Sequence, residues 1–291
     1  MNPLLATAAA FGLVLQAGAA LGQAAPRTGQ VRIVYEEATD ERHRVIRQAM
    51  QQRRILETVG AVLNSFRLPR ELTVEARGCQ GRETAWYDHD RAVFCYEYVD
   101  LIQRHAPKVA TPGGVQRADA IVAAVIDTIL HESGHGIFDL LEVPVMGREE
   151  DAADFFSIYL MLQFPPEDAR RLIEGIAFNM GSEARPEVAE RQAPQKFAGP
   201  HAMNAQRHYN VLCLAYGSNA ALFGGAMPAG LPPWRARFCG DDWGMLRRAF
   251  VKLILPHVDE TRLKDALAQA RFDWSPLGTA TESFDKPPLG D

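Results

Sequence analysis

Two histidines and a glutamate stand within five residues of an otherwise apolar stretch, DTILHESGHGIFDLL (residues 127–141). On an α-helix, His131 and His135 are four residues apart and share one face, so both imidazoles can bind the same metal ion. Glu132 lies beside them and can take a proton from a water molecule. Zinc accepts nitrogen and carboxylate oxygen ligands, and its catalytic sites keep one position open for water. The spacing therefore predicts a Zn2+ site that activates water for hydrolysis.

The segment around this motif decides between a metal site and an ordinary helix that carries three polar residues. A pattern with three fixed positions also arises by chance, and alone it is only a hypothesis. Apolar residues at positions 121, 122, 125, 126, 129 and 130 predict a buried helix over residues 117–141. Burying two imidazoles and a carboxylate without partners is costly. A bound metal removes that cost, so the context favours the metal site.

A third metal ligand is needed, and it cannot come from the same helix. Asp139 follows His135 by four residues, but three ligands stacked along one straight helix cannot converge on one ion. The longer pattern HExxHxxGxxH also fails, because Phe138 and Leu141 stand at its glycine and third-histidine positions. The third ligand must therefore lie on another segment.

An acidic run, EEDAAD (residues 149–154), begins a second predicted helix after a short turn that lets the two helices pack antiparallel. Glu150 and Asp154 are four residues apart and share one face of it. We expect Glu150 to bind the metal and Asp154 to accept the second ring N–H of His131. Glu149 is the alternative ligand. A solvent-exposed acidic helix start is the other reading, and the apolar residues that follow argue against it.

The elements around this helix pair predict an α+β fold that is mostly helical, with a small antiparallel sheet. Strands are expected at 71–76, 84–87 and 92–96, the last two forming a hairpin. Helices are expected over residues 40–66, 117–141, 148–162, 167–177, 204–216, 243–255 and 260–272. Residues 181–200 read as a polar loop. A single domain is predicted over residues 25–291, with residues 275–291 as a loose tail.

The N-terminal residues 1–24 form an apolar run rich in Ala, Leu and Gly that ends in small residues, as in a secretory signal peptide. The run has no Lys or Arg before its apolar part, so an uncleaved membrane anchor is the alternative. No other stretch approaches the length of a membrane span. We therefore predict an exported protein, periplasmic or secreted, with no stable membrane span in the mature chain.

Four cysteines in an apparently exported chain favour disulfides. The pairing of neighbours in sequence, Cys79 with Cys95 and Cys213 with Cys239, closes two modest loops and is the predicted one. A cysteine-rich zinc site is the competing interpretation, but no CxxC spacing supports it.

Composition excludes two classes of protein. The chain has 291 residues, of which 47% are hydrophobic and 23% charged, so it can bury a large core and is not disordered as a whole. Its formal net charge of -5 provides no basic field for a phosphate backbone, and a nucleic-acid partner is not expected.

The HESGH motif followed by residues 150–154, EDAAD, resembles the HExxH plus ExxAD signature of gluzincin metallopeptidases, which include thermolysin-like and CAAX-prenyl-protease-like enzymes. More closely, the chain resembles a bacterial family of putative metallopeptidases of unknown function, mostly exported, over most of residues 30–255. The segments that carry this resemblance are 79–97, 131–154 and 206–210, the last leading to Cys213 and to Tyr216-Gly217. The resemblance implies a zincin-like α+β fold but no settled substrate.

A peptidase of this kind also needs a group that stabilises the oxyanion of the tetrahedral intermediate. Downstream candidates are His201, Arg207, His208 and Tyr209, and Tyr87 in the hairpin is another. Thermolysin-like enzymes use a downstream histidine and tyrosine, so the resemblance points first to His201 and Tyr209. Alternatively, Arg207 forms a structural ion pair and Tyr209 belongs to the core.

These observations predict a zinc-dependent metallopeptidase that acts on a peptide or protein substrate. The second hypothesis is a non-catalytic zincin-like protein that uses zinc structurally and binds a partner protein. A third is a metal-free interaction protein of the cell envelope. The first two both require zinc, and they differ in whether Glu132 matters.

Overall fold

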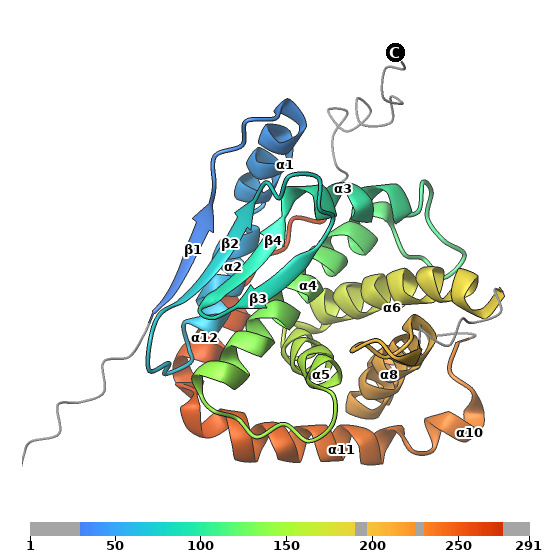
Figure 1. Cartoon of the computed structure of the whole chain (residues 1–291). Coiled ribbons are helices and arrows are strands. Elements are labelled where there is room, and N and C mark those ends of the chain that lie inside the picture. The colour runs from blue at the N-terminus through green and yellow to red at the C-terminus, as the bar shows by residue number, and fades with distance from the viewer. Residues whose placement is uncertain (1–29, 190–196, 225–229, 276–291) are drawn as a thin grey trace, which may run out of the picture.

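The computed structural model describes residues 30–189, 197–224 and 230–275 (Figure 1). The predicted signal peptide and the tail beyond residue 275 lie outside these ranges. The mixed α+β class is confirmed, with helices as the larger part and one four-stranded sheet. Among the described helices, none is long and apolar enough to cross a lipid bilayer.

The first half of the chain forms β1 (Val31–Tyr35), α1 (Glu41–Gln52), α2 (Ile55–Leu63), β2 (Leu72–Arg77), β3 (Ala85–Asp88), β4 (Arg91–Cys95), α3 (Tyr96–His105) and α4 (Arg117–Leu140). The second half forms α5 (Glu149–Met161), α6 (Pro166–Ala189), α8 (Asn204–Ser218), α9 (Ala220–Phe223), α10 (Pro233–Ala236), α11 (Cys239–Ala249), the π-helix η1 (Phe250–Ile254), the 3₁₀-helix η2 (Leu255–His257) and α12 (Glu260–Gln269).

The sheet has the strand order β1-β2-β4-β3, and it is mixed rather than wholly antiparallel as predicted. β3 and β4 form the expected antiparallel hairpin, in which Tyr87 lies opposite Ala92. β1 and β2 pair in parallel, as do β2 and β4. Helices α1 and α2 connect β1 to β2 and bring the chain back to the end of the sheet at which β1 begins. Two parallel neighbouring strands require such a crossover connection. Sequence periodicity identifies strands but does not contain their relative direction.

Several helix boundaries differ from the sequence prediction, most of all in the first helix and in α6. The helix expected over residues 40–66 is divided into α1 and α2, because Arg54 has a left-handed backbone with φ of 54° that no continuous helix allows. Asp40 caps α1 as expected, accepting from the backbone N–H groups of Arg42 and His43. α6 continues to Ala189, so the first part of the predicted loop 181–200 is helical.

α4 is the central helix, and it is buried along most of its length between the sheet and the other helices (Figure 1). The sheet packs onto the core with Leu72, Val74 and Phe94, which are at most 1% exposed. On its other side the sheet carries Glu75, whose carboxylate is covered by salt bridges to Arg77 and Arg91. The apolar face of the sheet therefore packs over α4, and its polar groups lie on the opposite face.

Both predicted disulfides are confirmed. Cys79 and Cys95 join the segment after β2 to the end of β4, with an S–S distance of 2.05 Å. Cys213 on α8 and Cys239 at the start of α11 are joined at 2.01 Å. The first bridge fixes the hairpin that carries β3, and the second fixes the segment before α11 against α8.

Candidate functional site

The two glycines of HESGHG allow α4 to approach its neighbours closely. A methyl group added at Gly134 would lie 3.0 Å from the ring of Phe156 on α5. One added at Gly136 would lie 2.9 Å from Leu72 on β2 and 3.0 Å from Tyr87 on β3. Larger residues at these two positions would separate α4 from α5 and from the sheet. The glycines therefore set the spacing of the walls around the histidines.

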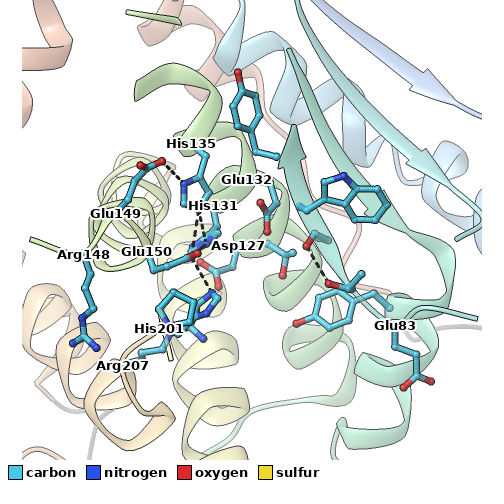
Figure 2. Close-up of a pocket in the computed structure, with 17 residues that line it drawn as sticks. Glu83, Asp127, His131, Glu132, His135, Arg148, Glu149, Glu150, His201 and Arg207 are labelled. Carbon is cyan, nitrogen blue, oxygen red and sulfur yellow. Dashed lines mark hydrogen bonds and ion pairs between the residues drawn. The ribbon is translucent and has the colours of Figure 1, made fainter. Parts of the chain in front are cut away.

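A pocket of about 710 Å³ opens between α4, α5, the strand β3 and the segment that precedes α8. Figure 2 shows the side chains of His131, His135, Glu150 and His201 pointing toward one another, with Glu132 beside them. The walls come from parts of the chain more than 100 residues apart in sequence, from Glu83 to Arg207. The predicted motif therefore lies on the wall of a cavity and not in the closed core.

Three donor atoms converge in this pocket. Nε2 of His131 lies 3.0 Å from Oε2 of Glu150. Nε2 of His135 lies 3.3 Å from Nε2 of His131 and 3.4 Å from the same oxygen of Glu150. The packing of α5 against α4 thus brings together the two histidines and the glutamate that the sequence predicted as a ligand set.

The second nitrogen of each imidazole is held by a carboxylate of α5. Nδ1 of His131 lies 2.9 Å from Oδ1 of Asp154. Nδ1 of His135 lies 2.7 Å from Oε1 of Glu149. A carboxylate at Nδ1 favours the tautomer that leaves the Nε2 lone pair free to bind a metal. Glu149, the alternative ligand of the sequence prediction, therefore lies behind a histidine and not among the converging donors.

These distances fit a tetrahedral metal ion. Zinc bonds of about 2.0–2.1 Å place neighbouring ligand atoms of a tetrahedron about 3.3 Å apart. The three separations between the donors are 3.0, 3.3 and 3.4 Å. Without a metal, a proton on His131 can link the Nε2 of His131 to Glu150, and a metal ion among the three atoms takes the place of that proton. The nitrogen and carboxylate donors therefore suit a divalent ion such as zinc.

Buried charges behind His131 are strongly coupled. Nε and Nη2 of Arg207 donate to the two carboxylate oxygens of Asp154 at 2.7 and 2.8 Å. Burial opposes ionisation of Asp154, but the hydrogen bonds from His131 and Arg207 outweigh it and hold its pKa well below its usual range. Burial likewise lowers the pKa of His131, but the hydrogen bonds to Asp154 and Glu150 outweigh it and raise that pKa to about 10. The surroundings of His131 therefore favour positive charge.

Glu132 lies on the β3 side of α4 and takes no part in the donor triangle. Its carboxylate accepts a hydrogen bond from the backbone N–H of Tyr87. Burial raises the pKa of Glu132, against the opposing charges of His131 and His135. A carboxylate with a raised pKa is a stronger base than one in water, which suits a group that must accept a proton.

His201 also reaches the donors. It lies in the segment before α8, and its Nε2 is 2.8 Å from Oε2 of Glu150. Its ring stacks on that of His131, with centroids 6.1 Å apart. Half of its side chain is exposed to the pocket, and burial of the remainder lowers its pKa. Of the downstream candidates, His201 is the one that the structure brings beside the predicted ligands.

The other candidates for the oxyanion group point elsewhere. Tyr209 is 41% exposed and lies outside the pocket, because two residues along α8 rotate it to the side opposite Arg207. His208 is turned toward α6, where its Nδ1 bonds to a backbone carbonyl. Tyr87 lines the pocket, but its hydroxyl donates to Asp139 at 2.8 Å. The position of Tyr209 therefore does not support the role predicted for it.

One acidic residue of the site was not assigned from the sequence. Asp127 lies four residues before His131 on α4, is 7% exposed and accepts a hydrogen bond from the hydroxyl of Ser157. Burial, together with the charge of nearby Asp154, raises its pKa to about 6. In the sequence, Asp127 could be recognised as a site residue only by its spacing of four from His131, which places the two side chains on one face of the helix.

A second group of potential metal ligands, Cys79, Cys95 and Glu97, does not form a metal site. Its two sulfurs are joined in a disulfide. The carboxylate of Glu97 accepts hydrogen bonds from the backbone N–H groups of Cys79 and Gly81 instead. Within the described ranges, the donor cluster on α4 and α5 is thus the one that fits a metal.

Comparison with known proteins agrees with this geometry. A family model described as a putative metallopeptidase, DUF4344, matches residues 35–254. No curated protein and no solved structure matches the chain. The matched range contains the whole pocket, from β3 through the helix pair to the start of α8. On this evidence of sequence, the chain belongs to the DUF4344 family of putative metallopeptidases.

Proposed function

We propose that this protein is a zinc-dependent peptidase of the gluzincin type, in which His131, His135 and Glu150 bind the metal. The convergence of their three donor atoms at separations of 3.0–3.4 Å is the observation that carries this proposal. Asp154 and Glu149 orient the two imidazoles. When bound, the ion supplies a Lewis acid that polarises the peptide carbonyl and makes water more acidic.

Glu132 is the general base of the proposed reaction. Its carboxylate takes a proton from the attacking water and later passes it to the nitrogen of the departing amine. The Tyr87 N–H keeps this carboxylate facing the pocket. Burial, which raises its pKa, limits solvation of the carboxylate and makes it a better proton acceptor.

His201 is the proposed oxyanion group. Its imidazole lies at the edge of the donor cluster, 2.8 Å from Glu150, and half of its side chain faces the cavity. The Nε2–H that faces Glu150 can turn to the oxygen that gains negative charge when the peptide carbonyl is attacked, and donate to it. Tyr209 is not included in this role, because it lies outside the pocket.

The wall formed by β3 supports a polypeptide as the substrate. Ala85, Trp86 and Tyr87 of this strand line the pocket. β3 is the last strand of the sheet, and in the described ranges no other strand pairs with its outer edge. An extended peptide can therefore bond to the backbone groups of this edge that Glu132 does not already bind, as substrates and ligands do at other sheet edges. Such a peptide would cross the pocket beside Glu132.

A comparison of Glu132→Gln with Glu83→Gln tests the mechanism. Both glutamates line the pocket, but Glu83 lies at its far end, paired with Arg104 (Figure 2). Glu132→Gln should retain stoichiometric zinc and lower kcat for peptide cleavage by about 10²–10⁴-fold. Glu83→Gln should keep most of the activity. Equal cleavage by wild type and Glu132→Gln would contradict the mechanism and favour a structural metal.

Absence of zinc would contradict both metal-dependent hypotheses. Zinc is measured in protein purified without chelator, and again after removal and addition of the metal. We expect about one zinc ion per chain. Peptide cleavage should be lost when the metal is removed and should return when it is added back. Protein that neither retains nor recovers zinc would leave the metal-free interaction protein as the remaining hypothesis.

Export and a single-domain organisation complete the proposal. Two disulfides support an oxidising compartment. One hydrophobic cluster extends from Val31 to Phe272, which supports a single domain over residues 25–291 after removal of residues 1–24. Fractionation of expressing cells and sequencing of the mature N-terminus test both the location and the cleavage of the leader. An intact leader on membrane-bound protein would support the alternative anchor.

A further inference from the structure

A second hollow adjoins the pocket on the far side of Arg148. It has a volume of about 380 Å³ and lies between α8 and the segment that carries α10. Tyr209 and Asn210 line it from α8, and Trp234 lines it from α10. We call it the α8 groove. Nothing in the proposed reaction uses it.

The α8 groove lies next to the pocket. Arg148 lines both hollows, and in Figure 2 its side chain points away from the donor cluster. Ala202 lines the groove and directly follows His201, which lines the pocket. Glu149 and Glu150 in turn directly follow Arg148. The two hollows therefore lie side by side at the start of α5 and the segment before α8.

The groove presents two exposed aromatic rings beside charged groups that already have partners. The side chains of Trp234 and Tyr209 are 61% and 41% exposed. Its two arginines are already paired, Arg148 with Asp151 at 3.1 Å and Arg235 with Asp242 at 2.6 Å. Paired arginines attract an acidic ligand weakly, whereas open aromatic rings gain from stacking against another ring or an apolar group. The groove therefore favours an aromatic or apolar side chain.

The walls of the groove are held in place before any ligand binds. The Cys213–Cys239 disulfide ties α8 to the helix that follows α10. The pair of Arg235 and Asp242 ties α10 to α11. A preformed surface loses little conformational entropy on binding, so exposed rings on it can contribute to affinity.

We propose that the α8 groove is an extended substrate-binding site, which holds an aromatic or apolar side chain of the same polypeptide whose scissile bond lies in the pocket. This proposal rests on the proposed peptidase function for the identity of its ligand. The shared border at Arg148 points to the substrate as the occupant rather than to a separate partner. Trp234 provides the main contact, since it is the more exposed of the two rings.

Binding is tested in the Glu132→Gln background, where cleavage does not interfere. Fluorescent peptides on the order of twelve residues are long enough to span both hollows, and one Phe is moved through a Gly/Ser sequence. At one position Phe should tighten binding about 3–10-fold, the range expected of an aromatic pair. Adding Trp234→Ala should remove this gain. Phe238→Ala is the matched control, because Phe238 is also a surface ring, 55% exposed, but does not line the groove.

The result separates failure of the groove from failure of the proposed function. A gain that depends on Trp234 but not on Phe238 supports the groove, even if wild type cleaves no peptide. If wild type cleaves peptides but Phe at no position gives a gain in binding that Trp234→Ala removes, the peptidase function stands and the groove proposal is overturned. Binding of an oligosaccharide, rather than of any peptide, that is lost in Trp234→Ala would also overturn it.

Discussion

The two histidines of the motif lie on one helix, yet they are supported in opposite ways. His131 is 5% exposed, and its partner Asp154 is buried and bound in turn by Arg207. His135 is held by Glu149, whose side chain is 55% exposed. One side of the site is thus a closed network of charges that connects α4, α5 and α8, and the other side faces solvent. We expect the closed side to control stability and metal affinity, and the open side to control turnover.

The largest effect is expected from Asp154→Asn on the closed side. The substitution keeps an oxygen for His131 but removes the carboxylate that binds the buried Arg207. Breaking a buried ion pair in this way costs about 3–5 kcal/mol, and loss of an orienting carboxylate weakens metal binding about 10–100-fold. Urea unfolding and zinc titration measure the two effects. Wild-type stability in this variant would mean that the closed network contributes little.

On the open side, His201→Ala should change turnover and little else. Loss of one donor to the oxyanion lowers kcat by about 10²–10³-fold, close to 3–4 kcal/mol in the barrier. The side chain is half exposed, so little folding energy depends on it. Peptide cleavage and zinc content are measured together. A loss of zinc that parallels the loss of activity would assign His201 to metal binding instead.

Asp127→Asn tests the pH dependence of the closed side. The pKa of Asp127 is raised to about 6, so the folded protein binds a proton that the unfolded chain has lost. Stability should therefore fall as the pH rises from about 4 to 6, and the carboxylate should cost up to about 3 kcal/mol above that range. Asp127→Asn should be more stable than wild type at pH 8 and similar at pH 4. Urea unfolding of both proteins at pH 4 and pH 8 measures their free energies of unfolding. The same difference between variant and wild type at both pH values would contradict the prediction.

The smallest effect is expected from Glu149→Gln. An exposed carboxylate is screened by water, so the free energy of unfolding should change by less than about 1 kcal/mol. Zinc affinity should fall about tenfold at most, at the low end for an orienting partner. If Glu149→Gln lost as much zinc affinity as Asp154→Asn, solvent exposure would be a poor guide to the importance of these two carboxylates.

Much of the donor set follows from spacing in the sequence. Residues four apart share a helix face, which places His131 with His135 and Glu150 with Asp154. The short turn between the helices then limits which faces can meet, and the structure brings Glu150 to the histidines. The disulfide pairs followed from loop length in the same local way.

Residues on more distant elements could not be placed by spacing. Tyr209 and Arg207 are two residues apart, and either could have faced the pocket, because the rotation of α8 about its axis is set mainly by its packing on α6 and α11. Glu149 and Glu150 raised the same difficulty at the start of α5, where one helical step decides which carboxylate lies among the donors.

The sequence alone determined the helix pair and predicted the residue types of the donor cluster and the class of chemistry, since these depend on local periodicity and on the ligands that zinc accepts. The tertiary structure decided the rest: the direction of the strands, the partners Arg207 and Glu149, the position of His201 beside Glu150 and the groove beyond Arg148. The physical reason is that these features depend on how separately formed elements rotate and pack in a shared core, which no single segment encodes.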